Sequence, residues 1–176
     1  MKKITSILSI LAFTAVFSTS ALAQQSSTAT STASTTIVAP IAITKVTDMS
    51  FGSFATGSAG TLVLSPAGLR NPTGGVKVTA TTGTVAAAEF KVTGEGSYGY
   101  DVTLPASLIL STTTAGTGTV KDMTVNTFTS SLTDNKGSLT SGSQNFTVGA
   151  TLNVVAAQAI GTYANAAGFS VTVNYN

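Results

Sequence analysis

The sequence contains no cysteine, no histidine and no tryptophan among its 176 residues. Without cysteine the chain can form no disulfide, so its stability must come from its own core or from a partner. Without cysteine and histidine, the usual nucleophile–base pairs and histidine-ligated metal sites cannot be built. We therefore expect no catalytic residue, no metal site and no cofactor, and we expect that the protein is not an enzyme.

Charged residues are also scarce, at 8% of the sequence. A hydrolase that uses two carboxylates needs only a pair of acids placed close together. The acids of this chain are dispersed, and solvated surface charge is the simpler interpretation, so an enzyme remains the weakest of three functional hypotheses. The six acids are Asp48, Glu89, Glu95, Asp101, Asp122 and Asp134.

The N-terminal stretch has the three parts of a secretory signal peptide. Lys2 and Lys3 form a positive start, an apolar run follows, and Ala21-Leu22-Ala23 is a small-residue cleavage site. We interpret residues 1–23 as a signal peptide, which predicts export through the periplasm to the cell surface or an extracellular fibre. Removing the two lysines leaves six basic residues against six acids. A neutral chain has no electrostatic footprint for nucleic acid or an anionic membrane, and we expect no membrane insertion.

The chain after the signal peptide divides into a short extension and one domain. Residues 24–35 are a low-complexity run of Gln, Ser, Thr and Ala, which cannot bury enough apolar area to order itself. We predict a flexible N-terminal extension at 24–35 and a single β-domain at 36–176.

Short alternating segments with Gly, Pro, Ser and Asn between them fill this domain. Such a pattern predicts an all-β sandwich or barrel with about eight to ten short strands. A turn is expected at 57–60, and the uneven spacing of Met123, Val125 and Phe128 predicts a bulge. The most regular alternation is that of Phe146, Val148, Ala150, Leu152 and Val154.

Two further alternating segments lie near the two ends of the sequence. At the C-terminal end, Phe169, Val171, Val173 and Tyr175 share one face of a predicted strand. At the N-terminal end the alternating residues lie within 36–46, where Pro40 restricts the strand to an edge or a crossing between sheets. They are Ile37, Ala39, Ile41 and Ile43. Residues 36–46 can be the first strand of the domain itself, which makes a closed monomer, or a strand given to a neighbour.

Several short motifs in matching order resemble subunits of bacterial chaperone–usher pili. The resemblance is closest to the spore-coat-protein-U-like branch and to small secreted bacterial proteins of unassigned function. The first motif, 49–52, is similar to an apolar-x-Phe-Gly start, and the second, 100–104, to a central Tyr-x-apolar-Thr-Leu strand. The third, 158–163, is similar to a Gln-x-x-Gly-Thr-Tyr approach to a last strand in which Tyr175 is the next-to-last residue.

The resemblance implies an incomplete immunoglobulin-like sandwich whose groove is filled from outside. In that family a periplasmic chaperone fills the groove first, and then the N-terminal extension of the next subunit replaces it with the help of an outer-membrane usher. The mode is β-augmentation, in which ladder hydrogen bonds give affinity and alternate side chains fill pockets. Here it implies that the candidates in 37–43 are the donor strand, that Phe169, Val171, Val173 and Tyr175 line the groove and pair with the chaperone, and that Gly161 and Tyr163 form the approach turn.

The leading hypothesis is therefore a structural subunit of a fibre or surface coat, with a possible role in adhesion or biofilm. The second hypothesis is a self-complete sandwich that binds glycans at the cell surface, because tyrosine rings stack on sugars. That alternative predicts a stable monomer whose glycan binding depends on Tyr98 or Tyr163.

Overall fold

The computed structural model describes residues 26–78, 83–113 and 116–176, so the predicted signal peptide lies outside the described residues. The chain divides into two units, Met1–Thr36 and Ile37–Asn176. In the first unit, residues 26–36 are exposed throughout and belong to no strand or helix. All of the strands named below lie in the second unit, which is called the domain from here on.

The domain is all-β, as the sequence predicts. Within the described residues it contains ten strands and two short 3-10 turns, Thr133–Asn135 and Thr140–Gly142. The strands are β1 (Ala42–Thr47), β2 (Ala55–Leu64), β3 (Arg70–Lys77), β4 (Ala88–Thr93), β5 (Gly99–Thr103), β6 (Ser107–Ser111), β7 (Asp122–Ser130), β8 (Lys136–Ser138), β9 (Ser143–Val154) and β10 (Thr172–Tyr175).

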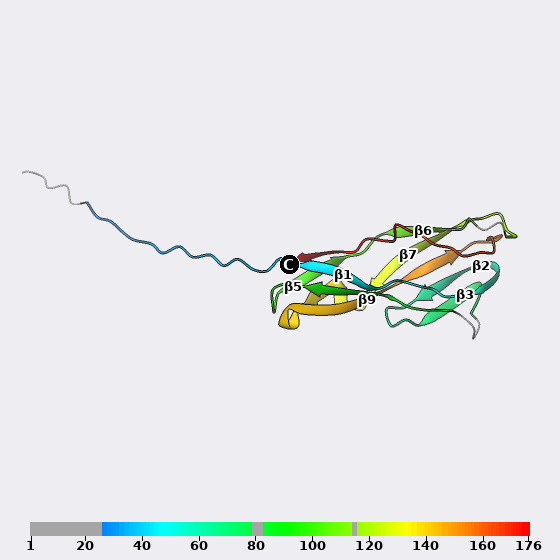
Figure 1. Ribbon diagram of the computed structural model, residues 1–176, viewed down its shortest axis with the longest axis horizontal. Helices are drawn as coiled ribbons and strands as arrows, with labels where there is room; N and C mark the ends of the chain where they lie inside the picture. The colour runs from blue at the N-terminus through cyan, green and yellow to red at the C-terminus, as the bar shows by residue number, and fades with distance from the viewer. Residues whose placement is uncertain (1–25, 79–82, 114–115) are drawn as a thin grey trace, which may run out of the picture. The chain divides into compact units, whose positions relative to one another are not determined.

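The long strand β9 is the centre of a seven-stranded antiparallel sheet (Figure 1). Its first half pairs with β4 and its second half with β2, while β7 pairs along its other edge. Outside these neighbours lie β1 on β4, β3 on β2 and β6 on β7. Because three strands pair with β9, the distance between two points in the domain can be estimated from the β9 residues that lie beside them.

A smaller antiparallel sheet, in the order β10-β5-β8, packs on one half of the large sheet. The buried cluster between the two sheets is called the sandwich core, and residues of β4, β5, β9 and β10 contribute to it. Its best-buried members are Val92, Tyr100, Leu139 and Val148, each 0% exposed. The burial of these apolar side chains between two sheets is what holds the sandwich together.

The alternation predicted along 146–154 is confirmed. All five apolar residues of that run are at most 2% exposed. The polar residues between them, Thr147, Thr151 and Asn153, are only partly buried. Phe146 also stacks on Phe90 of β4 with ring centroids 5.6 Å apart. A period of two is sufficient to place such side chains because a strand alternates its faces regularly.

The predicted bulge is also confirmed. The register between β7 and β9 shifts between Asn126 and Thr129, and Thr127 has a positive φ of 51°. The extra residue turns the strand, so that Phe128 packs against apolar residues on both halves of the large sheet.

The turn expected at 57–60 is wrong, because these residues lie inside β2. A Cβ on Gly60 would lie 2.2 Å from the Thr73 carbonyl oxygen of β3. Glycine is required here for the close approach of two strand backbones at a register shift, not for a reversal of the chain. The reversal comes at 65–69, where the Ser65 amide donates to the Leu69 carbonyl.

Tyr100 gives the sandwich core a measurable dependence on alkaline pH. Its side chain is 0% exposed and its hydroxyl donates to Gln144 Oε1 at 2.9 Å. Burial raises the pKa of Tyr100 above its usual value, so the folded chain retains a proton that the unfolded chain loses above about pH 10. Stability is therefore fully present below that pH and declines as the pH rises through it.

We expect Tyr100→Phe to cost about 1 kcal/mol of unfolding free energy at pH 8, the usual contribution of one such hydrogen bond. Above about pH 10 the difference from the parent chain should narrow, because Phe cannot ionise. Urea unfolding at several pH values measures this, with Tyr98→Phe at a 43% exposed position as the control. A difference that stays constant across the range would contradict the assignment.

Candidate functional site

The first and last strands of the domain are both edge strands. Strand β1 pairs with β4 alone and β10 pairs with β5 alone among the described residues. Each strand therefore leaves one row of backbone groups without a strand partner. Ile41, Ile43 and Val173 all pack against the sandwich core, so the two edges border the same core from opposite sheets.

The two edges are held together at one end by Tyr175. Its hydroxyl donates to the Ala39 carbonyl at 2.8 Å and accepts from the Glu95 amide at 2.6 Å. The Ala39 amide in turn donates to Glu95 Oε2 at 3.1 Å. We call these three bonds the Tyr175 latch. Figure 1 shows the end of β10 (red) beside the start of β1 (cyan) at this point.

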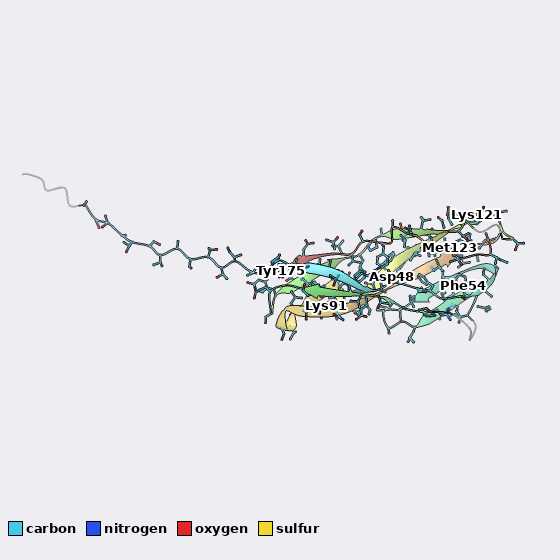
Figure 2. All side chains as sticks on the ribbon, viewed as in Figure 1. Asp48, Phe54, Lys91, Lys121, Met123 and Tyr175 are labelled. Carbon is cyan, nitrogen blue, oxygen red and sulfur yellow. The ribbon has the colours of Figure 1, made fainter. Side chains whose placement is uncertain are left out.

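Away from the latch, the segment after β1 and the segment before β10 separate and border a groove of about 1070 Å³. One bank is formed by residues 47–56, from the last residue of β1 to the start of β2, and the other by residues 158–169, which precede β10. Between described residues, no hydrogen bond joins these two banks. Figure 2 labels Tyr175 near one end of the domain and Phe54 toward the other, with Asp48 between them.

The floor of the groove is the second buried cluster of the domain, called the groove core. Leu152 and Val125 are at most 2% exposed, and Phe51, Leu110 and Met123 lie beside them. No residue of β5, β8 or β10 belongs to this cluster. The small sheet therefore covers the sandwich core and stops short of the groove core, which is bordered instead by the two banks, 47–56 and 158–169.

The length of the groove follows from its position along β9. At one end, Phe169 lies 6.1 Å, between ring centroids, from Phe90, which is paired with Phe146 of β9. At the other end, residues 158–160 follow β9, which ends at Val154. The interval from Phe146 to Val154 corresponds to about 26 Å of β-strand, at about 3.3 Å per residue. The groove therefore has the length of one ordinary strand.

The groove is almost without net charge. Lys45 and Asp48 are its charged lining residues among those described, and they form an ion pair with Nζ 2.5 Å from Oδ1. Both side chains are more than half exposed, so the pair adds little to stability. An occupant of this groove must be recognised by apolar contacts and backbone hydrogen bonds.

The predicted C-terminal residues divide between the two parts of the site. Phe169, Val171, Val173 and Tyr175 all pack against the sandwich core, so they share a face as the alternation predicts. Only Thr172–Tyr175 is strand, whereas Phe169 also borders the groove. Gly161 and Tyr163 lie on the bank that leads to β10.

The predicted donor strand does not stay together in the structure. Ile43 pairs with Val92 of β4, and Ile41 and Ile43 are partly buried on the sandwich core of their own domain. Ala39 is held by the Tyr175 latch, whereas Ile37 is 94% exposed. Residues 41–43 are therefore part of the domain itself, because they have apolar neighbours and a ladder partner there. Residues 26–37, by contrast, are all exposed and belong to no strand.

Two side chains that shape the groove were not singled out as site residues from the sequence. Arg70 Nη1 donates to the carbonyls of Phe51 and Ser53 at 3.1 and 3.0 Å and so holds one bank. On the other bank, Gln158 Nε2 donates to the Val120 and Asp122 carbonyls. Neither contact could be found from spacing, because each joins segments that are far apart in the sequence.

The tyrosines do not form one exposed surface. Tyr100 is buried. The Tyr163 hydroxyl donates to the Ala159 carbonyl at 2.7 Å and accepts a hydrogen bond from Gln158 Nε2. Tyr98 is half exposed but its ring packs edge-on against Tyr175. The two tyrosines named for glycan binding also lie apart, since Tyr163 packs on the groove core and Tyr98 lies beside the latch.

Within the described residues, no group of three or more His, Cys, Asp or Glu side chains is placed to hold a metal ion. None of the described segments is a helix with the length and apolar character needed to cross a membrane.

Residues 41–175 match the model of a family described as Domain of unknown function (DUF4402). The chain belongs to the DUF4402 family. The match spans β1 to β10, so both banks of the groove and its floor are parts of the DUF4402 domain. The extension and Ile37 precede it. No curated protein and no solved structure matches the chain.

Proposed function

We propose that this DUF4402 domain is a non-enzymatic structural subunit that assembles into an extracellular fibre or surface coat by donor-strand exchange. The observation that carries the proposal is the strand-length groove with an apolar floor between residues 47–56 and 158–169, two segments that no hydrogen bond joins to each other among the described residues. A groove with these edges is suited to accept one extended segment, which supplies hydrogen bonds to both banks and side chains to the floor.

The energetics favour an occupied groove over an empty one. The groove core has apolar side chains on its floor and no second sheet above them. The deepest floor residues are already shielded, so filling the groove removes from water the surface of partly exposed lining residues such as Phe54, Leu108 and Leu110. It also gives partners to bank backbone groups other than those already bonded, as Ser50 is to Ala86 and Ala164 to Ser111. A free subunit is therefore expected to be less stable than an assembled one, and polymerisation is driven by completing the fold.

The donor that we propose is residues 26–38 of another copy. Fully extended, this segment reaches about 40 Å, which exceeds the groove length of about 26 Å. Its residues are exposed and outside any strand, with Val38 half-buried at its end. On one face of an extended chain lie Ala29, Ser31, Ala33, Thr35 and Ile37. Small residues suit a groove whose floor is already closely packed. In this proposal Ile37 remains a donor candidate, and the small residues before it replace Ala39, Ile41 and Ile43.

The same groove explains why partners are needed before assembly. An exported subunit with an open apolar groove is prone to wrong association, because free strand edges pair readily. We propose that a periplasmic chaperone covers the groove in transit and that an outer-membrane usher directs its replacement by the next subunit. The finished assembly lies at the cell surface, where adhesion or biofilm formation is its expected role.

A synthetic peptide tests this proposal directly. A peptide of residues 26–38 should raise the melting temperature of a domain that begins at Ile37, because a ligand bound only to the folded state stabilises it. At a peptide concentration of 100 times its dissociation constant the gain is about 2.7 kcal/mol. The control peptide carries Pro at positions 30 and 32, which removes ladder donors. If both peptides, or neither, stabilise the domain, the proposal is wrong.

A further inference from the structure

We infer that the assembly is head-to-tail and that Ile37 of one copy packs against Ile160 of the next copy, at the open mouth of the groove. This inference rests on the proposed donor-strand exchange and adds the direction of insertion and the contact that joins successive domains. The occupant to which it commits is a second copy of this chain.

Ile37 and Ile160 are two of the most exposed large apolar side chains of the domain. Ile37 is 94% exposed and Ile160 is 70% exposed. Val155, which lies on the same loop after β9, is 46% exposed. Burying one such side chain against another removes apolar surface from water at both. The two exposed positions are therefore complementary in chemistry.

The two positions lie at opposite ends of the domain, so they cannot meet within one copy. Ala42 pairs with Thr93 of β4, and Thr93 pairs with Ser143 at the start of β9. Ile160 follows β9, whose last residue is Val154. The length of β9, from Ser143 to Val154, corresponds to about 36 Å. Ile37 precedes the first of these points and Ile160 follows the last.

The direction of insertion follows from which end of the groove is open. At the end nearer the latch, Phe169 closes the groove by packing on Phe90 and Phe128, whereas Ile160 lines the opposite end. A donor segment therefore enters beside Ile160. Its own domain stays outside, because Ala39 of the donor copy is held by that copy's latch. Ile37 lies only two residues before Ala39, about 7 Å of extended chain, so it remains at the mouth next to Ile160.

A contact between unlike surfaces at opposite ends of identical copies leaves a free surface at each end of any short chain of copies, so further copies can be added. Such heterologous contacts extend into open chains unless a rotation closes a ring. The inference therefore predicts a polar fibre in which the latch end of each domain follows the mouth of the one before it.

The test uses the chain beginning at Gln24, with assembly followed by light scattering and electron microscopy. Ile160→Asp should weaken association about tenfold, because a charge replaces an apolar side chain that becomes buried on assembly. Leu69→Asp is the matched control, since Leu69 is 71% exposed and lies outside the lining of the groove. It should leave assembly unchanged, and thermal melting should be the same for both variants.

A disulfide provides the second measurement, because the chain has no cysteine of its own. The double variant Ile37→Cys with Ile160→Cys should form disulfide-linked ladders between copies on mild oxidation, whereas Ile37→Cys with Leu69→Cys should not. If the fibre assembles but Ile160→Asp has no effect and the first pair gives no ladder, this contact is wrong while donor-strand exchange stands. If fibres are equally abundant without residues 24–36, donor-strand exchange itself is wrong.

Discussion

A chain that begins at Ile37 should remain monomeric at concentrations where the chain beginning at Gln24 forms polymers. This truncation removes the proposed donor segment and leaves the domain Ile37–Asn176 whole. It also keeps Ala39, Glu95 and Tyr175, so the latch can still form. Because the acceptor groove is intact and the donor is missing, the expected change in polymer content is close to complete loss. Size-exclusion chromatography with light scattering measures it.

The truncated chain should also stop the growth of polymers made by the longer chain. It can accept a donor segment in its groove but has none to offer, so each copy that joins a fibre ends it. Adding it at increasing ratios to the longer chain should shorten the fibres seen by electron microscopy. The chain beginning at Gln24 with Thr30→Pro and Thr32→Pro should also fail to donate, because proline removes ladder donors without shortening the chain. Polymers of normal length in either experiment would refute the proposed donor.

Gly149→Ala should destabilise the domain more than any surface substitution, by about 3 kcal/mol. Gly149 lies in β9 at the point where β2 ends and β4 begins to pair with the same edge. A Cβ there would lie 2.1 Å from the Leu64 carbonyl oxygen and 2.7 Å from the Pro66 nitrogen. Both are backbone atoms, which cannot rotate away as a side chain would, so β2 would have to move off β9.

Gly57→Ala is the control for this prediction. Gly57 is also a strand glycine, but a Cβ there would meet no atom within 4 Å. Alanine also loses less backbone entropy on folding, so the control should be neutral or slightly stabilising. Urea unfolding of both variants in the truncated background measures the difference without interference from polymers. Equal stabilities for the two variants would show that β2 can shift freely, and would contradict the close crossing of strands at Gly149.

The fold class could be predicted because it depends on periodicity, which is a local property. The run from Phe146 to Val154 alternates without interruption, and the strand has one face on the core throughout. The bulge in β7 was predictable for the same reason, since three apolar residues with uneven spacing can share a face only if the strand gains a residue. Residues 57–60 mark the limit, because glycine in a turn and glycine between close strands look alike in a sequence.

The residues at both ends of the domain were visible in the sequence, but their roles were not. Alternation shows that Ile41 and Ile43 have an apolar side, yet it cannot tell whether that side faces the chain's own core or another molecule's groove. Strand β4 decides this, because its pairing with Ile43 places both isoleucines on the sandwich core. The donor that we propose therefore lies before the latch, in residues that the sequence identifies only as a polar, low-complexity run.

The sequence by itself determined the all-β class, the shared face of the last strand and the shortage of groups for chemistry. These depend on residue type and spacing alone. Only the tertiary structure decided that the groove exists, that Tyr175 joins the first and last strands beyond one of its ends, and that Ile37 and Ile160 lie toward opposite ends of β9. Each of those facts joins segments that are far apart in the chain, as Ala39, Glu95 and Tyr175 are. Contacts of this kind are set by how the two sheets pack, and no local pattern encodes them.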